Sequence, residues 1–381
     1  MADVRERLPI SQLHFHGTRP GNEKYFAGIN SDFQSPSARI EWLDAAKGAC
    51  LILVVLYHTV VYIFLNSPLS DTLSFKVWQI MVVGLGWLRM PLFFLISGFL
   101  AHSAVFNRNW RDVFQPRIAT FLWIYLLWMS IELGFRAFLI ANFDPALVPG
   151  NVPFPLGLDD LARHALVGDT PIWYLYALVI YFVACKLGSR HIGLTFALIA
   201  LLAVFYKQVI PTQHWNLLSL AGNAIFFTAG CYGKAYVERL ASQFNGMRFS
   251  LACVSAIGLL ALGRHYDAMG LPGANLVVAT CLVIAAIDFF TLLARRYPLR
   301  LLCTLGRHTL SIYLLSFFII NIAAQLISPL QLPALFAEAF VLFAPPVLVA
   351  LNAVLCIQIY SLLNCHLGRI LFSLPSRALT K

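Results

Sequence analysis

The sequence predicts an all-α, polytopic integral membrane protein with about ten transmembrane helices. Of its 381 residues, 60% are hydrophobic and 12% are charged, whereas roughly half of the residues in soluble domains are apolar. The mean hydropathy is +0.76, and the apolar residues form repeated runs with charged segments between them. Because a hydrocarbon core about 30 Å thick needs about 20 apolar residues per helix, we interpret these runs as membrane spans.

Ten apolar runs are the candidates for these spans. They lie at about 43–65, 77–101, 117–141, 172–187, 192–206, 216–231, 249–263, 273–293, 308–328 and 336–363. Several are shorter than a full span, so their boundaries are approximate.

The distribution of basic residues predicts the orientation. If the N-terminus is cytoplasmic, all but six of the 27 Lys and Arg residues fall in cytoplasmic loops and tails, as the positive-inside rule expects. The six on the outer side are Lys76, Arg89, Arg136, Arg163, Lys207 and Arg264. This pattern favours an even number of spans with both termini cytoplasmic. It also explains the net charge of +10 without a nucleic-acid partner, since no basic soluble face is formed.

The chain is expected to have three parts. Residues 1–38 are predicted to be a disordered cytoplasmic tail, because they lack the apolar segment of a signal peptide. Residues 39–365 form the membrane domain, and residues 366–381 form a short cytoplasmic tail. The Pro-rich segment 142–171 is a candidate lid or acceptor-binding element. The eight cysteines show no metal-ligand spacing, so we expect no metal site and no bound cofactor.

The first span carries the candidate chemistry. Lys47 and His58 are eleven residues apart, so a helix places them within about 20° of one another and about 16 Å apart along its axis. Asp44 lies one turn before Lys47 and can pair with it. This column suits a cytoplasmic acyl-CoA, whose phosphates Lys47 would hold while the thioester reaches His58. Imidazole, with an ordinary pKa of about 6.5, can take a proton from an attacking hydroxyl.

Both residues also have simpler interpretations. His58 could be a buried histidine bonded to a neighbouring hydroxyl or carbonyl, and Lys47 could be an interfacial anchor. Ionisable residues within a membrane are costly and usually functional. This favours a catalytic His58 and leaves both interpretations of Lys47 open.

The second span combines Arg89 with Pro91. Because proline is favoured at the start of a helix, we expect the helix to break or restart at Pro91, with Arg89 facing the interior. Arg89 either stabilises a developing oxyanion or bound group or pairs with Glu132 of the third span. Both interpretations of Arg89 stay open, because Arg136 lies one helical turn from Glu132 and can pair with it in place of Arg89. Gly98 is expected at a helix contact.

Two further groups are candidates for substrate binding. Arg108 and Arg111 share one face of a predicted helix at i, i+3, which suits a CoA phosphate, although positive-inside charge explains them more simply. Trp173, at the outer start of the fourth span, belongs either to the interfacial aromatic belt or to a surface that stacks on a sugar ring.

Several motifs resemble those of the acyltransferase-3 family of bacterial membrane O-acyltransferases, in particular the branch related to sugar O-acetylases. The resemblance extends from about residue 39 to 365. The matching elements, in order, are Lys47 and His58 with ten residues between them, MPLFFLISGFL at 90–100, Arg108-x-x-Arg111, PIWYL at 171–175 and LGRHTLSIY at 305–313. The family often has a histidine shortly after the last motif, where this chain has Leu314, Leu315 and Ser316.

The resemblance implies transfer of an acyl group, expected to be acetyl, from cytoplasmic acetyl-CoA to a hydroxyl of a cell-surface or secreted glycan or lipid-linked sugar. Acyl-CoA is then a donor substrate, and the enzyme lies in the inner membrane in contact with lipid. We assign catalysis to His58 and Arg89, donor binding to Lys47, Asp44, Arg108 and Arg111, and acceptor binding to Trp173 and Glu132.

A rival hypothesis from another class is a secondary transporter or glycolipid flippase. Its proton relay would consist of the buried side chains of His58, Arg89, Glu132 and Asp288. We also expect Asp288 to pair with Arg295 or Arg296. A transporter would function without acyl-CoA, which separates the two hypotheses.

Overall fold

A computed structural model describes residues 41–143, 157–365 and 368–375, and every regular element within those ranges is a helix. The part described belongs to one unit, Ile40–Lys381. The expectations for residues 1–38 and for half of the C-terminal tail, residues 366–367 and 376–381, lie outside the described residues. The same holds for residues 144–156 of the expected outer segment, whose described remainder contains a short helix, α7.

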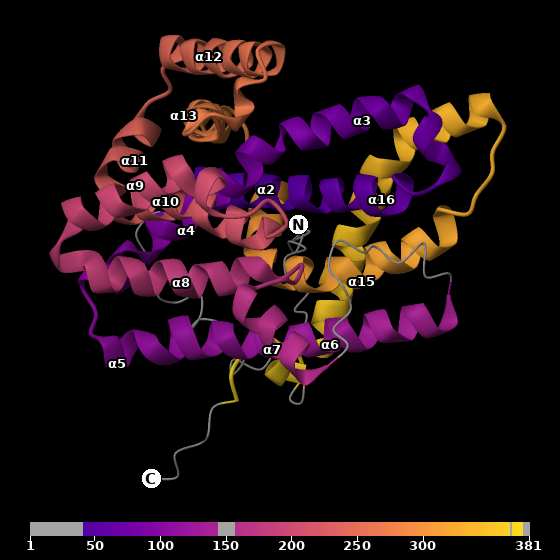
Figure 1. Cartoon of the computed structure of the whole chain (residues 1–381), viewed down its shortest axis with the longest axis horizontal. Coiled ribbons are helices and arrows are strands. Elements are labelled where there is room, and N and C mark those ends of the chain that lie inside the picture. Colours follow the sequence, from indigo (N-terminus) through magenta and orange to yellow (C-terminus); the bar gives the residue numbers. More distant parts are fainter. Residues whose placement is uncertain (1–40, 144–156, 366–367, 376–381) are drawn as a thin grey trace, which may run out of the picture. The chain divides into compact units, whose positions relative to one another are not determined.

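The helices follow the ten predicted runs (Figure 1). Their bounds are α2 Glu41–Thr59, α3 Leu73–Gly84, α4 Gly86–Phe106, α5 Trp110–Val113, α6 Thr120–Asn142, α7 Leu158–Val167, α8 Trp173–Leu187, α9 Ile192–Val209, α10 Trp215–Tyr232, α11 Lys234–Ser242, α12 Gly246–His265, α13 Ala274–Arg296, α14 Arg300–Arg307, α15 Thr309–Ile327 and α16 Ala334–Leu363. Two π-helical segments, η2 Val60–Phe64 and η4 Phe114–Ala119, continue α2 and precede α6.

Eight helical segments of the described chain are long and apolar enough to cross a membrane, which makes this a multi-pass membrane protein. They are Glu41–Phe64, Leu73–Phe106, Trp110–Asn142, Ile192–Val209, Gly246–His265, Ala274–Arg296, Thr309–Ile327 and Ala334–Leu363. The remaining two predicted runs form α8 and α10, and both helices pack against α4. α8 has only 15 residues, and α10 is less apolar because it carries Asn216, Ser219 and Asn223.

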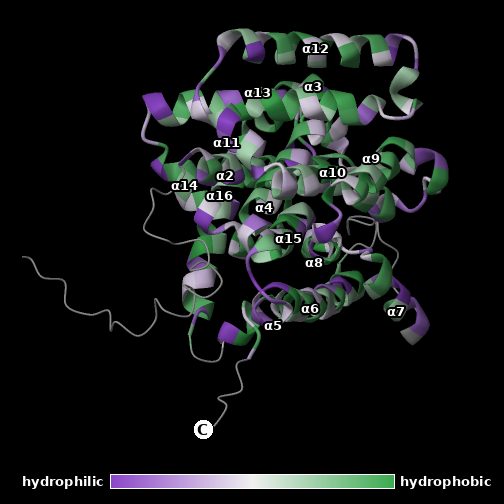
Figure 2. Cartoon of the chain, turned by 90° about the vertical axis from the view of Figure 1, so that its left-hand side faces the viewer, coloured by the Kyte–Doolittle hydropathy of each residue, from purple (hydrophilic) through white to green (hydrophobic). Residues whose placement is uncertain are grey.

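The surface of the long helices suits contact with lipid. Figure 2 shows hydrophobic residues along most of their length, with hydrophilic residues gathered near helix ends and connections. Large apolar side chains such as Leu194 of α9, Val254 of α12 and Leu335 of α16 are more than half exposed. Exposed apolar area on this scale is costly in water and is expected of helices that face hydrocarbon.

Close contact between α4 and α10 depends on glycine. A Cβ atom at Gly98 of α4 would overlap the Phe227 carbonyl oxygen of α10, and one at Gly230 of α10 would overlap the Leu95 carbonyl oxygen of α4. The expectation that Gly98 lies at a helix contact is confirmed. Small residues let two membrane helices approach until their backbones touch, so this pair is a fixed part of the bundle.

Close contact between the start of α2 and α14 also depends on glycine. A Cβ at Gly48 would overlap the Leu302 carbonyl oxygen, and a Cβ at Gly306 would overlap the Asp44 carbonyl oxygen. α14 therefore holds the end of α2 that carries Asp44 and Lys47.

The second span breaks earlier than expected. α3 ends at Gly84 and α4 begins at Gly86, so Pro91 lies inside α4 and does not start a helix. The two glycines flank the break, and glycine weakens a helix more than most residues do. Arg89 lies in the first turn of α4, where its backbone N–H donates to the Leu85 carbonyl. The helix of the second span thus breaks one turn before Arg89, between Gly84 and Gly86, and Pro91 does not cause the break.

We expect Gly98→Ala to lower the free energy of unfolding by about 1–3 kcal/mol, because the added methyl group must separate α4 from α10. Gly258→Ala in α12 is the matched control, since a Cβ there would meet no atom within 4 Å. Thermal unfolding of the detergent-solubilised protein compares the two variants. A Gly98→Ala protein as stable as the Gly258→Ala protein would contradict the packing described.

Candidate active site

The first turns of α2 hold an ion pair. Lys47 Nζ lies 3.1 Å from Asp44 Oδ1, which confirms the expected pairing at i, i+3. The Asp44 side chain is nearly buried and Lys47 is half-buried. Asp44 therefore partly neutralises the ammonium group at the end of α2 and restricts its position.

His58 lies near the other end of α2, one residue before the helix passes into η2. Its ring contacts those of Tyr57 and Tyr62, with centroid distances of 5.1 and 5.0 Å. Its Nδ1 atom is buried and has no hydrogen-bond partner among the described residues. A neighbouring hydroxyl or carbonyl of the described residues does not satisfy this nitrogen, which favours the catalytic interpretation of His58 over that of a bonded core histidine.

His58 lines a cavity of about 330 Å³ together with Arg89 and Trp173. Helices α2, α4, α6, α8, α10 and α15 and the turn before α8 contribute to its wall. The lining residues are Val54, Tyr57, His58, Tyr62, Arg89, Met90, Arg136, Pro171, Trp173, Trp215, Ser219, Tyr313 and Phe317. The structure thus brings together three of the residues that the sequence singled out from three separate spans.

Arg89 is held by an aromatic ring and a backbone carbonyl. Its Cζ lies 3.9 Å from the centre of the Tyr57 ring, and its Nη1 donates to the Val82 carbonyl oxygen at 3.1 Å. Within the described ranges it forms no ion pair with Glu132, so that alternative is not observed. The contact with Tyr57 is a cation–π interaction, which is stronger away from water, and it places the guanidinium group beside His58.

Glu132 of α6 lies next to this cavity without forming part of its wall. Glu132 and Arg136 are both 4% exposed, and Arg136 contributes to the cavity wall. Both lie close to Tyr62 of the same wall. Glu132 is thus separated from direct contact with a molecule in the cavity.

Arg108 and Arg111 do not share a helical face. α4 ends at Phe106, and Asn109 adopts an extended conformation before α5 begins at Trp110. Arg108 therefore precedes the helix that contains Arg111, contrary to the expectation of an i, i+3 pair. The Arg108 carbonyl oxygen accepts a hydrogen bond of 2.7 Å from Lys186 Nζ, and the Arg111 side chain is exposed.

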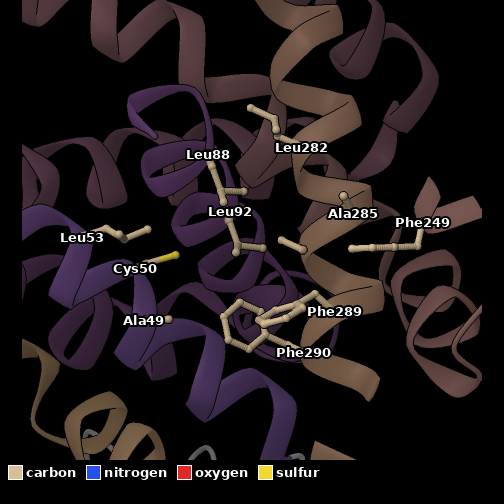
Figure 3. A pocket seen from close by; sticks show the side chains of 11 residues that line it. Ala49, Cys50, Leu53, Leu88, Leu92, Phe249, Leu282, Ala285, Phe289 and Phe290 are labelled. Atoms are coloured by element: carbon tan, nitrogen blue, oxygen red, sulfur yellow. The ribbon is translucent and has the colours of Figure 1, made fainter. Parts of the chain in front are cut away.

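A second cavity beside α2 has no chemistry of its own (Figure 3). It measures about 300 Å³ and is lined by Ala49, Cys50, Leu53, Leu88, Leu92, Phe249, Leu282, Ala285, Ala286, Phe289 and Phe290. None of these side chains carries a charge or an acid–base group other than the thiol of Cys50. The His58 cavity is therefore the better candidate for an active site.

Comparison with known proteins assigns the chain to a family. Residues 40–357 match the profile of the acyltransferase-3 family, which is described as an acyltransferase domain. The chain belongs to the acyltransferase-3 family. The chain is also 28% identical over 301 residues to the inner membrane protein YcfT of Escherichia coli strain K12, an alignment that covers 75% of this chain and 82% of YcfT. No solved structure matches.

Asp288 of this acyltransferase has a different partner from the one expected. It is fully buried and pairs with Arg248 of α12, with Nε–Oδ2 and Nη2–Oδ1 distances of 2.7 and 2.5 Å. The Asn245 backbone N–H donates to the same carboxylate at 3.1 Å. The expectation of a pair with Arg295 or Arg296 is wrong, because packing of α12 on α13 brings Arg248 closer.

Among the cavity residues that the sequence analysis did not assign to a site are Tyr57, Tyr62, Arg136, Trp215 and Tyr313. Tyr313 ends the family-like motif at 305–313, and its hydroxyl donates to the Pro171 carbonyl oxygen at 2.7 Å. Its position in that motif could have identified Tyr313 as a candidate site residue. The others look like ordinary span or interface residues in the sequence, since aromatic residues are common there.

We expect Asp288→Asn to lower the free energy of unfolding by about 2–3 kcal/mol, because it breaks a charged hydrogen-bond network. Glu238→Gln is the control, because it removes an exposed ion pair with Lys234 that contributes little. Turnover per folded molecule should be unchanged in both variants. Loss of turnover in a stably folded Asp288→Asn protein would contradict a purely structural role for Asp288.

Proposed function

We propose that this acyltransferase moves an acyl group, expected to be acetyl, from cytoplasmic acyl-CoA to a hydroxyl group of a cell-surface or secreted glycan. The observation that carries the proposal is His58, which lines a polar cavity with Arg89 and whose Nδ1 atom has no hydrogen-bond partner among the described residues. A neutral imidazole nitrogen without a protein partner is available to accept a proton from a substrate.

The donor is proposed to lie along α2. Ten spans with both termini in the cytoplasm, as the basic residues predict, put Lys47 at the cytoplasmic mouth and His58 deeper in the membrane. The two lie about 16 Å apart along the helix axis, a length suited to the pantetheine arm of CoA. Lys47, positioned by Asp44, would hold the CoA phosphates, and Arg108 and Arg111 would add charge at the same side of the membrane.

The chemistry proposed for the cavity is general-base catalysis. His58 takes the proton of the acceptor hydroxyl as its oxygen forms a bond to the thioester carbon. The guanidinium group of Arg89 stabilises the negative charge that develops on the carbonyl oxygen. The carbon–sulfur bond then breaks, and the imidazolium returns the proton to the CoA thiolate. Trp173 is proposed to stack on a sugar ring, and Glu132 is proposed to support the acceptor side of the site from its place near Tyr62.

The location proposed is the inner membrane. The structure has eight candidate spans, and the relative YcfT is named an inner membrane protein. Such a location gives the enzyme access to cytoplasmic acyl-CoA on one side and to glycans or lipid-linked sugars on the other.

We expect His58→Gln to reduce acylation of surface glycans by about 10²–10⁴-fold, because general-base catalysis contributes about that factor. His102→Gln is the matched control, since His102 also lies in a span but its Nδ1 is 2.7 Å from the Cys231 carbonyl oxygen. Mass spectrometry of surface glycans compares both variants with the wild type and a deletion strain, at equal membrane abundance of the protein.

Two results would count against the proposal in different ways. Acetylated glycan in the His58→Gln strain at the wild-type level, with loss only in the deletion strain, would exclude His58 as the base. Glycans unchanged in the deletion strain would exclude the glycan acceptor.

A further inference from the structure

A second polar cleft adjoins the His58 cavity. It measures about 290 Å³, and α4, α8, α9, α10 and α13 all contribute to its wall. Four residues line both spaces, namely Arg89, Met90, Trp173 and Ser219. Together the two spaces reach the size of small-molecule sites, roughly 300–1,000 Å³. The cleft is therefore next to the His58 cavity, with Arg89 in the wall of both.

The cleft is positively charged. Arg89 and Lys207 are its only charged lining residues among those described, and no carboxylate lines it. Lys207 Nζ donates to the Met269 carbonyl oxygen at 3.0 Å and lies 5.9 Å from the centre of the Trp87 ring. An ammonium group has three donor hydrogens, and no acidic side chain in the described ranges pairs with this one. A cation near a membrane span without an anionic partner is costly, so the cleft favours an anion.

The remaining wall suits a sugar ring. The rings of Trp87, Trp173 and Tyr206 line the cleft, and aromatic faces stack on sugars. Asn275 is 8% exposed; its Nδ2 donates to the Tyr206 hydroxyl at 3.2 Å, and its Oδ1 is buried without a hydrogen-bond partner. Asn275 thus adds a polar side chain to this wall. At Gly222 a Cβ would lie 3.1 Å from the Tyr206 ring, so glycine keeps this part of the cleft open.

Several basic residues that do not follow the positive-inside rule lie in the walls of this cleft and of the adjoining cavity. Of the six basic residues that the predicted topology leaves on the outer side, Arg89 and Lys207 line this cleft and Arg136 lines the adjoining cavity. Orientation in the membrane does not require these charges. Binding of an anionic substrate would explain why these basic residues are present.

From the charge and lining of this cleft, we infer that the acceptor is an acidic sugar whose carboxylate or phosphate binds between Lys207 and Arg89. The inference rests on the proposed function, because it names the acceptor class for the same active site. The anionic group binds in the cleft, the ring stacks on the aromatic wall, and a hydroxyl of the same or the next sugar reaches His58. Lys207 is a specificity residue in this arrangement and takes no part in proton transfer.

The test uses purified full-length protein with acetyl-CoA and three matched acceptors: glucose, glucuronate and glucose 6-phosphate. CoA release is measured with each acceptor and without any, and mass spectrometry identifies the acetylated sugar. We expect glucuronate, glucose 6-phosphate or both to stimulate CoA release with a KM at least about tenfold below that of glucose, a ratio typical of one charge-assisted contact. The acid sugar that stimulates more strongly identifies the anionic group.

Variants of Lys207 separate specificity from structure. Lys207→Gln should raise the KM for the acid sugar about tenfold and leave the KM for acetyl-CoA unchanged, while Lys207→Arg should restore most of the preference. Lys76→Gln is the control, because Lys76 is exposed on α3, also on the predicted outer side, and does not line the cleft.

Each contrary result has a distinct meaning. Equal use of glucose, no stimulation by any of the three sugars over acceptor-free hydrolysis, or an unchanged preference in Lys207→Gln would overturn the acidic-sugar inference while leaving acyl-CoA chemistry intact. Failure of the folded protein to consume acetyl-CoA under every condition would instead overturn the proposed function.

Discussion

The contact between the Arg89 guanidinium group and the Tyr57 ring is the interaction on which the candidate site depends. A cation among membrane helices needs a partner, and the ring centre lies 3.9 Å from Arg89 Cζ. Because Tyr57 precedes His58 on α2, this contact holds α4 against α2 at the depth of the histidine. A fixed cation thus lies beside an imidazole nitrogen that has no protein partner. That combination of groups is the basis of the acyl transfer proposed for this cavity.

Close helix packing builds the wall opposite this contact. Gly98 and Gly230 let α4 and α10 approach until their backbones touch, which brings Trp215 and Ser219 of α10 to the cavity. The polar residues that make α10 less apolar than the eight candidate spans are in part those that line the two polar spaces. The composition of α10 is therefore explained in part by the site it faces, since Ser219 and Asn223 line these spaces.

Local features of the fold and site were predictable from the sequence, and long-range partners were not. Hydropathy located the helices, and helical spacing predicted the Asp44–Lys47 pair, because both depend on neighbours along the chain. The sequence also singled out Arg89, but its alternatives named Glu132 and not Tyr57. Choosing between such partners needs the packing of one helix on another. Asp288 shows the same limit, since its partner comes from a helix about 40 residues earlier in the chain.

The column along α2 is the central claim, and a structure of the protein with a non-hydrolysable acetyl-CoA analogue tests it most directly. We expect the CoA phosphates beside Lys47 and the acyl carbonyl oxygen within hydrogen-bond distance of the Arg89 guanidinium group, next to His58. An acyl group in the apolar cavity beside Cys50, or phosphates bound away from Lys47, would contradict the account.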